Sequence, residues 1–171
     1  MIQGERVSVV PFEMKHLHAY FNGFDAETTK FQWPDPFESI EDARFVLQSF
    51  LDEMDRGETL LFSILSKNDE FLGSVEFHGL MGDRPELGIW IKASERNKGY
   101  AYEALNAVLH HVSSKYSKSE FYYEADIRNI GSIELLHKLD DQYEIIEQGL
   151  ERLTTDSGKA LELQGHILKA K

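Results

Sequence analysis

The sequence predicts a mixed α/β domain in which a largely antiparallel run of strands precedes a strand–loop–helix unit. Segments with strand-like patterning alternate with segments whose apolar residues recur at helical spacing, and the period changes after Gly57. No internal repeat or low-complexity tract interrupts this order. A chain of 171 residues most simply forms one domain, here 1–171, with one sizeable core.

The amino-terminal part predicts a strand and a short helix. Residues 6–10 alternate in polarity and are followed by Pro11, which stops a strand. Residues 13–24 then have helical periodicity, with an apolar side made by Leu17, Tyr20, Phe21 and Phe24. The aromatic, proline-broken segment 31–37 predicts a loop whose rings pack over the core or line a site.

A second helix is expected from Ser39 to Gly57. Ser39 stands three residues before Asp42, the spacing of a helix cap, although Asp is a weaker partner there than Glu. Apolar spacing continues the helix through Phe45, Val46, Ser49, Phe50 and Met54. Gly57 then ends it, since glycine readily takes a terminating conformation.

Three successive strands are expected after Gly57. Residues 60–66 and 71–80 are strand-like and are separated by the turn residues 67–69. Pro85 opens the third strand, which covers 86–92. Short connections of this kind favour antiparallel neighbours.

The remaining chain predicts the strand–loop–helix unit and a closing hairpin. A polar loop at 93–98 leads into a helix over 99–115, whose apolar face is Ala101, Ala104, Leu105, Val108, Leu109 and Val112. A strand at 121–127 and a helix at 130–139 follow. Two last strands flank 156–159, whose Ser-Gly pair suits a tight turn.

Composition excludes several functional classes. With 18 Lys and Arg against 30 Asp and Glu, the net charge of −12 argues against broad nucleic-acid binding. The absence of cysteine excludes disulfides, thiolate zinc sites and a Cys nucleophile. No apolar run approaches a membrane span of about 20 residues, and the amino terminus lacks the order of a signal peptide. We therefore expect a cytoplasmic protein without a membrane partner.

The segment from Arg96 to Ala101 carries the strongest chemical signal. A glycine at a helix start lets the backbone approach a ligand, and the free N–H groups and helix dipole there favour an anion such as phosphate. Arg96 and Lys98 add positive charge in an acidic chain. The alternative is that Gly99 only eases a strand-to-helix turn. The segment matches neither a Walker loop nor a dinucleotide fingerprint.

These residues resemble the GNAT N-acetyltransferase superfamily, in particular its RimJ/RimL-type branch. Arg96-x-x-Gly99-x-Ala101 is similar to the family's Gln/Arg-x-x-Gly-x-Gly/Ala loop, and the strand Glu86-Leu87-Gly88 precedes it as in that branch. Asn129-Ile130-Gly131-Ser132 is similar to the family's Asn-x-x-Ser segment. The resemblance is firmest over 72–139 and elsewhere follows the order of elements. It implies a mostly antiparallel twisted sheet flanked by helices and splayed where the cofactor binds.

The resemblance also implies acetyl-CoA as co-substrate and direct transfer to an amine, without a covalent enzyme intermediate. The CoA pyrophosphate would lie on Arg96, Asn97, Lys98, Gly99, Tyr100 and Ala101. Main-chain groups of Ile89, Trp90 and Ile91 would pair with the pantetheine arm, and Asn129 would hydrogen-bond it. Ser132 would help the thiolate leave, because no Tyr occupies the neighbourhood of Leu136 and His137.

The general base is left open among three side chains or a water. Glu86 is the candidate implied by its place at the strand start, with a solvated carboxylate or a partner for Arg84 as the alternative. Glu76 alternates with apolar neighbours and can face the same cleft, and His78 is a third option. The histidine pairs elsewhere do not have metal-ligand spacing, so no metal is expected.

The leading function is an N-acetyltransferase acting on a small amine or a protein amino terminus. The alternative is a CoA-binding regulatory module, motivated by the missing Tyr and by Asp140-Asp141 where the family usually has Gly-Phe. A third interpretation is an enzyme that uses a longer acyl-CoA. The sequence does not choose the acceptor, and it leaves a homodimer open.

Overall fold

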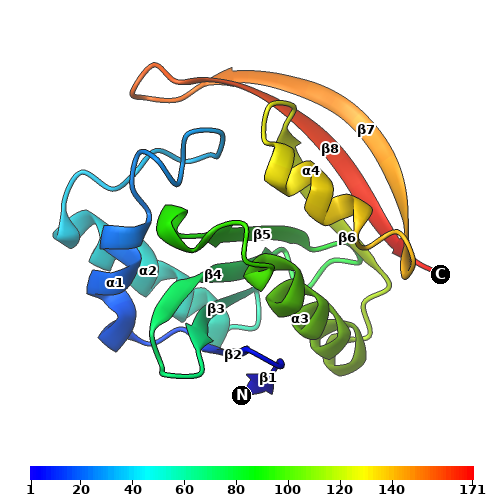
Figure 1. The fold of residues 1–171 in the computed structure, drawn as a ribbon, viewed down its shortest axis with the longest axis horizontal. Helices are drawn as coiled ribbons and strands as arrows, with labels where there is room; N and C mark the ends of the chain where they lie inside the picture. Colours follow the sequence, from blue (N-terminus) through cyan, green and yellow to red (C-terminus); the bar gives the residue numbers. More distant parts are fainter.

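The computed structural model describes residues 1–171 and contains an eight-stranded sheet flanked by four α-helices (Figure 1). The strands are β1 (Ile2–Gln3), β2 (Val7–Pro11), β3 (Thr59–Ser66), β4 (Phe71–His78), β5 (Glu86–Ile91), β6 (Glu120–Asp126), β7 (Tyr143–Thr154) and β8 (Ala160–Ala170). The helices are α1 (Leu17–Gly23), α2 (Ile40–Asp55), α3 (Tyr100–Tyr116) and α4 (Ile130–His137), with short 3-10 turns at Met14–His16 and Ala93–Glu95.

The sheet has the order β1-β2-β3-β4-β5-β6-β8-β7. All neighbouring strands are antiparallel except β5 and β6, which are parallel and are joined through α3. A parallel pair needs a crossover connection of this kind, whereas antiparallel neighbours can be joined by short turns. The mixed, mostly antiparallel sheet predicted from the sequence is confirmed.

Helices cover both faces of the sheet, and each face has its own hydrophobic cluster (Figure 1). α3 and α4 pack on one face, where Leu105 and Leu136 belong to the larger cluster with Phe77 and Phe121. α1 and α2 pack on the other face through Leu17 and Leu47. Burial on both sides explains why β3 reads as an almost continuous apolar run.

The sheet opens between β5 and β6. These strands are paired only at Glu86 with Tyr122 and at Leu87 with Tyr123. From Gly88 to Ile91, β5 keeps its antiparallel partner β4 but has none on the β6 side. The main chain of β5 is therefore free on that side, as expected for a sheet splayed at a ligand site.

Most predicted elements are present with small changes in their ends. The helix expected over 13–24 begins as a 3-10 turn and becomes α-helical only at Leu17. The strand β1 and both 3-10 turns were not predicted, because two or three residues carry no measurable periodicity. The Ser39 cap is confirmed, since its side chain accepts a hydrogen bond from the Asp42 N–H.

One apolar residue of the spacing that predicted α2 does not pack against the sheet. Phe45 is 78% exposed, whereas the helix buries Ala43 and Leu47 on either side of it. Each lies two residues from Phe45, a rotation of about 200° around a helix. Phe45 therefore points to solvent because the packed side of α2 is set by its contact with the sheet.

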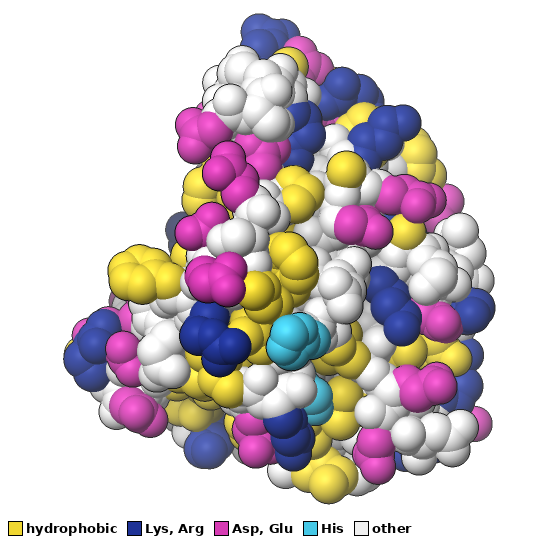
Figure 2. Space-filling model, turned by 90° about the vertical axis from the view of Figure 1, so that its left-hand side faces the viewer, with side chains coloured by type: hydrophobic (Ala, Val, Ile, Leu, Met, Phe, Trp, Pro, Cys, Tyr) yellow, Lys and Arg dark blue, Asp and Glu magenta, His cyan; other side chains and the backbone are white.

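The surface mixes charges and apolar groups. On the side of the molecule shown in Figure 2, Lys and Arg side chains alternate with Asp and Glu, and hydrophobic side chains gather near the middle beside histidines. No helix combines the length and apolar character needed to cross a membrane.

Candidate active site

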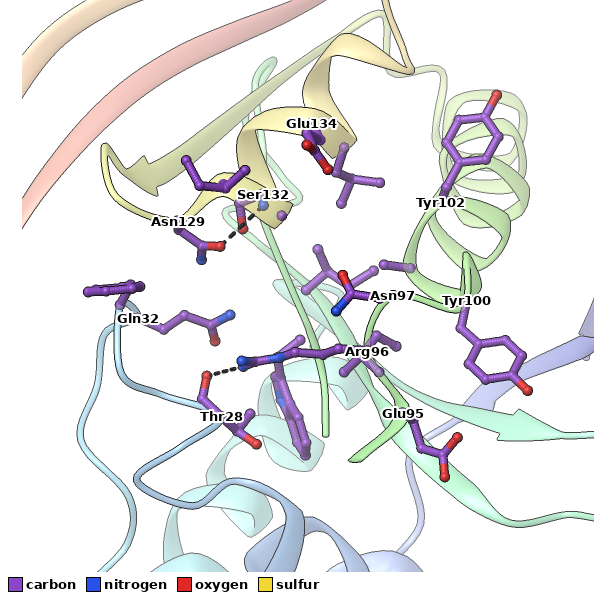
Figure 3. A pocket seen from close by; sticks show the side chains of 18 of the residues that line it. Thr28, Gln32, Glu95, Arg96, Asn97, Tyr100, Tyr102, Asn129, Ser132 and Glu134 are labelled. Atoms are coloured by element: carbon purple, nitrogen blue, oxygen red, sulfur yellow. Dashed lines mark hydrogen bonds between the residues drawn. The ribbon is translucent and has the colours of Figure 1, made fainter. Parts of the chain in front are cut away.

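A cavity of about 530 Å³ lies where β5 and β6 separate (Figure 3). It is bounded by β5, the start of α3, the start of α4 and residues 27–32. The predicted site residues that line it are Ile89, Trp90, Ile91, Arg96, Asn97, Gly99, Tyr100, Ala101, Asn129 and Ser132. The structure thus brings together three segments that are separate in the sequence, and each contributes to one cavity.

Gly99 forms the amino-terminal boundary of α3 in a conformation that suits glycine. Its φ angle is +83°, in the left-handed region, and a Cβ placed there would lie 3.0 Å from Nη2 of Arg6. The first N–H groups of α3 have no intrahelical partner and point out of the helix start. This end of the cavity is therefore suited to an anion.

Arg6, far away in the sequence, holds this loop in place. Its guanidinium donates a 2.7 Å hydrogen bond to the carbonyl oxygen of Lys98 and forms a 2.9 Å ion pair with Glu103. It also lies 5.0 Å from the ring centroid of Tyr100. Glu103 in turn accepts a hydrogen bond from the backbone N–H of Val7. The loop and the first turn of α3 are therefore tied to β2.

We expect Arg6→Met to weaken CoA binding about fivefold. The variant keeps an apolar stem but loses the hydrogen bond to the Lys98 carbonyl, worth about 1 kcal/mol, while the surface ion pair adds little. Isothermal titration calorimetry with CoA measures the effect, and Arg44→Met on the outer side of α2 is the control. Unchanged affinity in a folded Arg6→Met protein would contradict a positioning role.

The two basic side chains of the loop take different directions. Arg96 lines the cavity and donates a 2.6 Å hydrogen bond across it to the carbonyl oxygen of Thr28 (Figure 3). Lys98 forms a 2.7 Å ion pair with Glu95 and is not among the cavity-lining residues. Both positively charged side chains of this loop therefore make contacts within the protein, and these contacts stabilise the conformation of the loop.

Asn129 and Ser132 begin α4 at the opposite wall. The Asn129 side-chain oxygen accepts a hydrogen bond from the backbone N–H of Ser132, which caps the helix (Figure 3). The amide nitrogen of Asn129 remains available to the cavity that the residue lines. Burial raises the pKa of Tyr123, and the nearby Ser132 side chain acts in the opposite direction.

The three candidate bases share the sheet face covered by α1 and α2. Glu76 and His78 lie two residues apart on β4, and Glu86 on β5 is directly opposite His78. Partial burial raises the pKa of Glu86, and the nearby charge of Glu124 raises it further. Arg84 pairs with Glu120 at 2.6 Å, so the interpretation of Glu86 as a partner for Arg84 is wrong.

Further acidic and phenolic groups surround these three side chains. The Tyr122 hydroxyl donates a 2.9 Å hydrogen bond to Glu124, and burial together with that carboxylate raises the pKa of Tyr122 to about 12. Burial and the charge of Glu76 also raise the pKa of Tyr20. This region is thus rich in carboxylates and is suited to a cation.

A family model for the acetyltransferase (GNAT) domain matches residues 6–140. The chain belongs to the GNAT acetyltransferase family. That match covers the loop at Arg96–Ala101, the Asn129–Ser132 segment and all three candidate bases.

Curated relatives of this GNAT chain include acetyltransferases of bacteria. A ribosomal-protein-serine acetyltransferase of Escherichia coli is 28% identical over 99 residues, which is 57% of this chain and 55% of that protein. An uncharacterized N-acetyltransferase of Bacillus licheniformis is 28% identical over 131 residues, which is 75% of this chain and 74% of that protein. The first match thus spans about half the length of the relative.

Solved structures share the GNAT fold over nearly the whole chain. Spermidine N-acetyltransferase from Vibrio cholerae, in complex with CoA and spermine, has a TM-score of 0.79 at 15% identity, covering 96% of both chains. RimJ of Mycobacterium smegmatis, in complex with CoA-disulfide, has a TM-score of 0.82 at 19% identity, covering 96% of this chain and 82% of that one. At these identities the likeness establishes the fold.

Several contacts around the cavity of this GNAT protein have no signal in the sequence, although the aromatic segment 31–37 was expected to pack over the core or line a site. Phe31 lines the cavity and lies 4.8 Å from the guanidinium of Arg128, while Lys159 donates hydrogen bonds to the carbonyls of Thr29 and Gln32. These contacts join the loop before α2 to the turn before α4, through Arg128, and to the β7–β8 hairpin, through Lys159. Trp33, expected to pack over the core or line the site, is 64% exposed and lines no part of the cavity.

Asp140 and Asp141 stand where the family usually has Gly-Phe, and α4 ends here without a residue in the left-handed conformation. Neither Asp has a positive φ angle, and the turn closes through hydrogen bonds from the Gln142 and Tyr143 N–H groups to the Leu139 carbonyl. Leu139 is fully buried, which anchors the turn. The helix end is therefore shaped by right-handed turns in place of a glycine stop.

No group of three or more His, Asp or Glu side chains is arranged to hold a metal ion. His16 instead lies 2.9 Å from the Ser63 hydroxyl. CoA, by contrast, is bound in the similar structures of spermidine N-acetyltransferase and RimJ. The cavity of this chain combines a helix start with free N–H groups and an open strand edge, two features that suit a CoA molecule.

Proposed function

We propose that the protein transfers an acetyl group from acetyl-CoA to a primary amine. The observation that carries this proposal is the end of β5–β6 pairing at Leu87, beside a cavity of about 530 Å³. The open edge of β5 provides main-chain donors and acceptors, and the start of α3 provides a site for negative charge. These two features suit the two chemically different parts of CoA.

Each part of CoA has a complementary segment of the cavity. The pyrophosphate would lie at Arg96–Ala101, where the helix start is held by Arg6. The pantetheine arm would run along Ile89–Ile91 as an added strand, and Asn129 would donate a hydrogen bond to it from the opposite wall. The thioester would then lie near Ser132, at the point where β5 and β6 separate.

The acceptor approaches from the face covered by α1 and α2. Glu76 and Glu86 lie there with Glu124, in a chain of net charge −12. Carboxylates so placed favour a cationic amine. A spermidine acetyltransferase crystallised with spermine shares the fold, and a ribosomal-protein-serine acetyltransferase is a sequence relative. We therefore propose a polyamine or a peptide amino terminus as the acceptor class.

Direct transfer requires that the ammonium group lose a proton and that the negative charge on the leaving thiolate be stabilised. An alkyl ammonium cannot attack a carbonyl carbon until it loses a proton, and Glu86 receives that proton directly or through one water. The neutral amine attacks the thioester, and the Ser132 hydroxyl donates a hydrogen bond to the departing sulfur. A general base works best when its pKa lies near the operating pH, and the pKa of Glu86 is raised in that direction.

Acetyl-CoA binding and turnover test this function together. We expect acetyl-CoA to bind and a panel of polyamines and short peptides to give thiol release with at least one acceptor. Binding without turnover on any amine would support the alternative of a CoA-binding regulatory module. Absence of CoA binding would overturn both. A cytoplasmic location and a homodimer stay predictions from the sequence.

We expect Ser132→Ala to lower kcat about 10- to 100-fold with nearly unchanged CoA affinity. The hydroxyl meets a charge that develops only as the thiolate leaves, so its loss raises the barrier without weakening the ground state. Ser114→Ala, on the far end of α3, is the control. Full turnover by Ser132→Ala would leave the residue with a packing role only.

A further inference from the structure

A series of side-chain contacts connects α2 to Glu76, one of the carboxylates on the face from which the acceptor is proposed to approach. Glu53 on α2 accepts a 2.6 Å hydrogen bond from the Thr59 hydroxyl at the start of β3. The same hydroxyl oxygen lies 3.4 Å from Nδ1 of His78 on β4, its direct partner across the strand pair. Nε2 of His78 lies 3.4 Å from Oε1 of Glu76. The four residues come from three elements.

This series of contacts determines which nitrogen of His78 carries the proton. A threonine hydroxyl has a single hydrogen, and Thr59 gives it to the Glu53 carboxylate. The oxygen of Thr59 can then only accept from His78, so Nδ1 must carry a hydrogen. In the neutral ring, Nε2 is therefore the basic nitrogen. It faces Glu76, which stabilises the imidazolium once Nε2 gains a proton.

The ring is also fixed in position by its neighbours. Phe50 of α2 packs edge-on against the His78 ring with 5.2 Å between centroids, and Thr59 is only 1% exposed. The His78 side chain itself is 34% exposed, so a proton taken at Nε2 can leave to water. A buried orienting group and an accessible basic nitrogen are the features of a proton-transfer histidine.

We propose that Glu53 and Thr59 position His78 to take over the proton that the acceptor amine gives to Glu86. The N–H bond of the ammonium breaks and its electron pair stays on nitrogen. The proton passes through Glu86, directly opposite on β5, to Nε2 of His78, and then to solvent. This inference rests on the proposed function and assigns two positioning residues to it.

Carboxylates on its own strand and on two neighbouring elements, α2 and β5, act on His78. Glu76 from its own strand, Glu53 from α2 and Glu86 from β5 raise its pKa, while partial burial lowers it. The hydrogen bond with Glu76 is the largest of these influences. Replacing Glu53 by Gln removes one negative charge, so His78 should lose its proton at a lower pH than in the wild type.

Nuclear magnetic resonance of the imidazole nitrogens tests the positioning without any substrate. Long-range ¹⁵N–¹H spectra, with the His78 signals assigned by their absence in His78→Gln, report which nitrogen carries hydrogen in the neutral ring. We expect the Nδ1–H form in the wild type and in Thr59→Ser, and a shift toward the Nε2–H form in Thr59→Val. Retention of the Nδ1–H form in Thr59→Val would overturn the inference.

Titration separates the effect of Glu53 from a general charge effect. We expect the His78 midpoint to fall in Glu53→Gln and to stay in place in Asp52→Asn, which removes the neighbouring exposed carboxylate of α2. Equal shifts in the two variants, or no shift in either, would overturn the assignment of Glu53. Both variants keep the size of the side chain, so a folding defect is not expected.

Turnover then shows whether the positioned histidine is used. With an amine found by screening, we expect Thr59→Val to lower kcat about tenfold, with Thr59→Ser restoring it and CoA affinity unchanged. Wild-type kcat in Thr59→Val would overturn the relay. Failure of the wild type to turn over any amine, with the Nδ1–H form still observed, would instead overturn the proposed function.

Discussion

Gly99→Glu is expected to abolish detectable CoA binding, a loss of more than about 100-fold. Three effects act in the same direction. A residue with a Cβ is strained at a φ angle of +83°, and the new atom would lie 3.0 Å from Nη2 of Arg6. The added carboxylate would stand at the helix start where we propose that the pyrophosphate binds, and like charges repel there. Calorimetry with CoA measures the loss.

Two further variants separate these contributions. Gly57→Glu also introduces glutamate at a positive φ, +74°, but has no atom within 4 Å of the new Cβ. We expect it to bind CoA like the wild type. Gly99→Ala adds the backbone strain and the contact with Arg6 without the charge, so an intermediate affinity is expected. Normal CoA affinity in a folded Gly99→Glu protein would remove this loop from the site.

Glu86→Gln is expected to lower kcat about 10²- to 10³-fold, within the range that a general base supplies. The amide keeps the size of the side chain but cannot take a proton. Since Glu86 does not line the cavity proposed to hold CoA, the affinity for CoA should change little. Steady-state kinetics with the screened amine, together with CoA titration, measures both quantities.

The pH dependence provides a second measure of Glu86. The pKa of this carboxyl is raised, so its basic form is lost at a higher pH than for an ordinary glutamate as the solution is acidified. Protonation of Glu86 should therefore make kcat fall as the pH is lowered. We expect this fall to disappear in Glu86→Gln and to persist in Glu41→Gln, an exposed position on α2. A wild-type profile in Glu86→Gln would transfer the role of first base to Glu76.

The structure around the candidate site was predictable where its signals are local. The turn into α3 depends on Gly99, and the cap of α4 depends on Asn129, both of which act on the backbone within a few residues. Such preferences depend on consecutive residues, so the loop, the two helix starts and the strand that precedes them can be located from the sequence alone. The family match over 6–140 confirms the resemblance carried by these segments.

Contacts between distant residues were not predictable in the same way. Nothing near Arg6 indicates that it holds the carbonyl of Lys98, and nothing near Thr59 indicates that it lies between Glu53 and His78. These pairings depend on strand register and on which side of α2 faces the sheet. The same cause explains Phe45, whose helical spacing was correct and whose direction was not.

The sequence by itself determined the order of nearly all strands and helices, the turn at Gly99 that begins α3 and the residue types available for proton transfer. The tertiary structure decided where the sheet opens, that Lys98 pairs with Glu95, and which face gathers Glu76, His78 and Glu86. The physical reason is that backbone preferences act over a few residues. The position of a side chain relative to distant partners follows from packing the whole sheet between its two layers of helices.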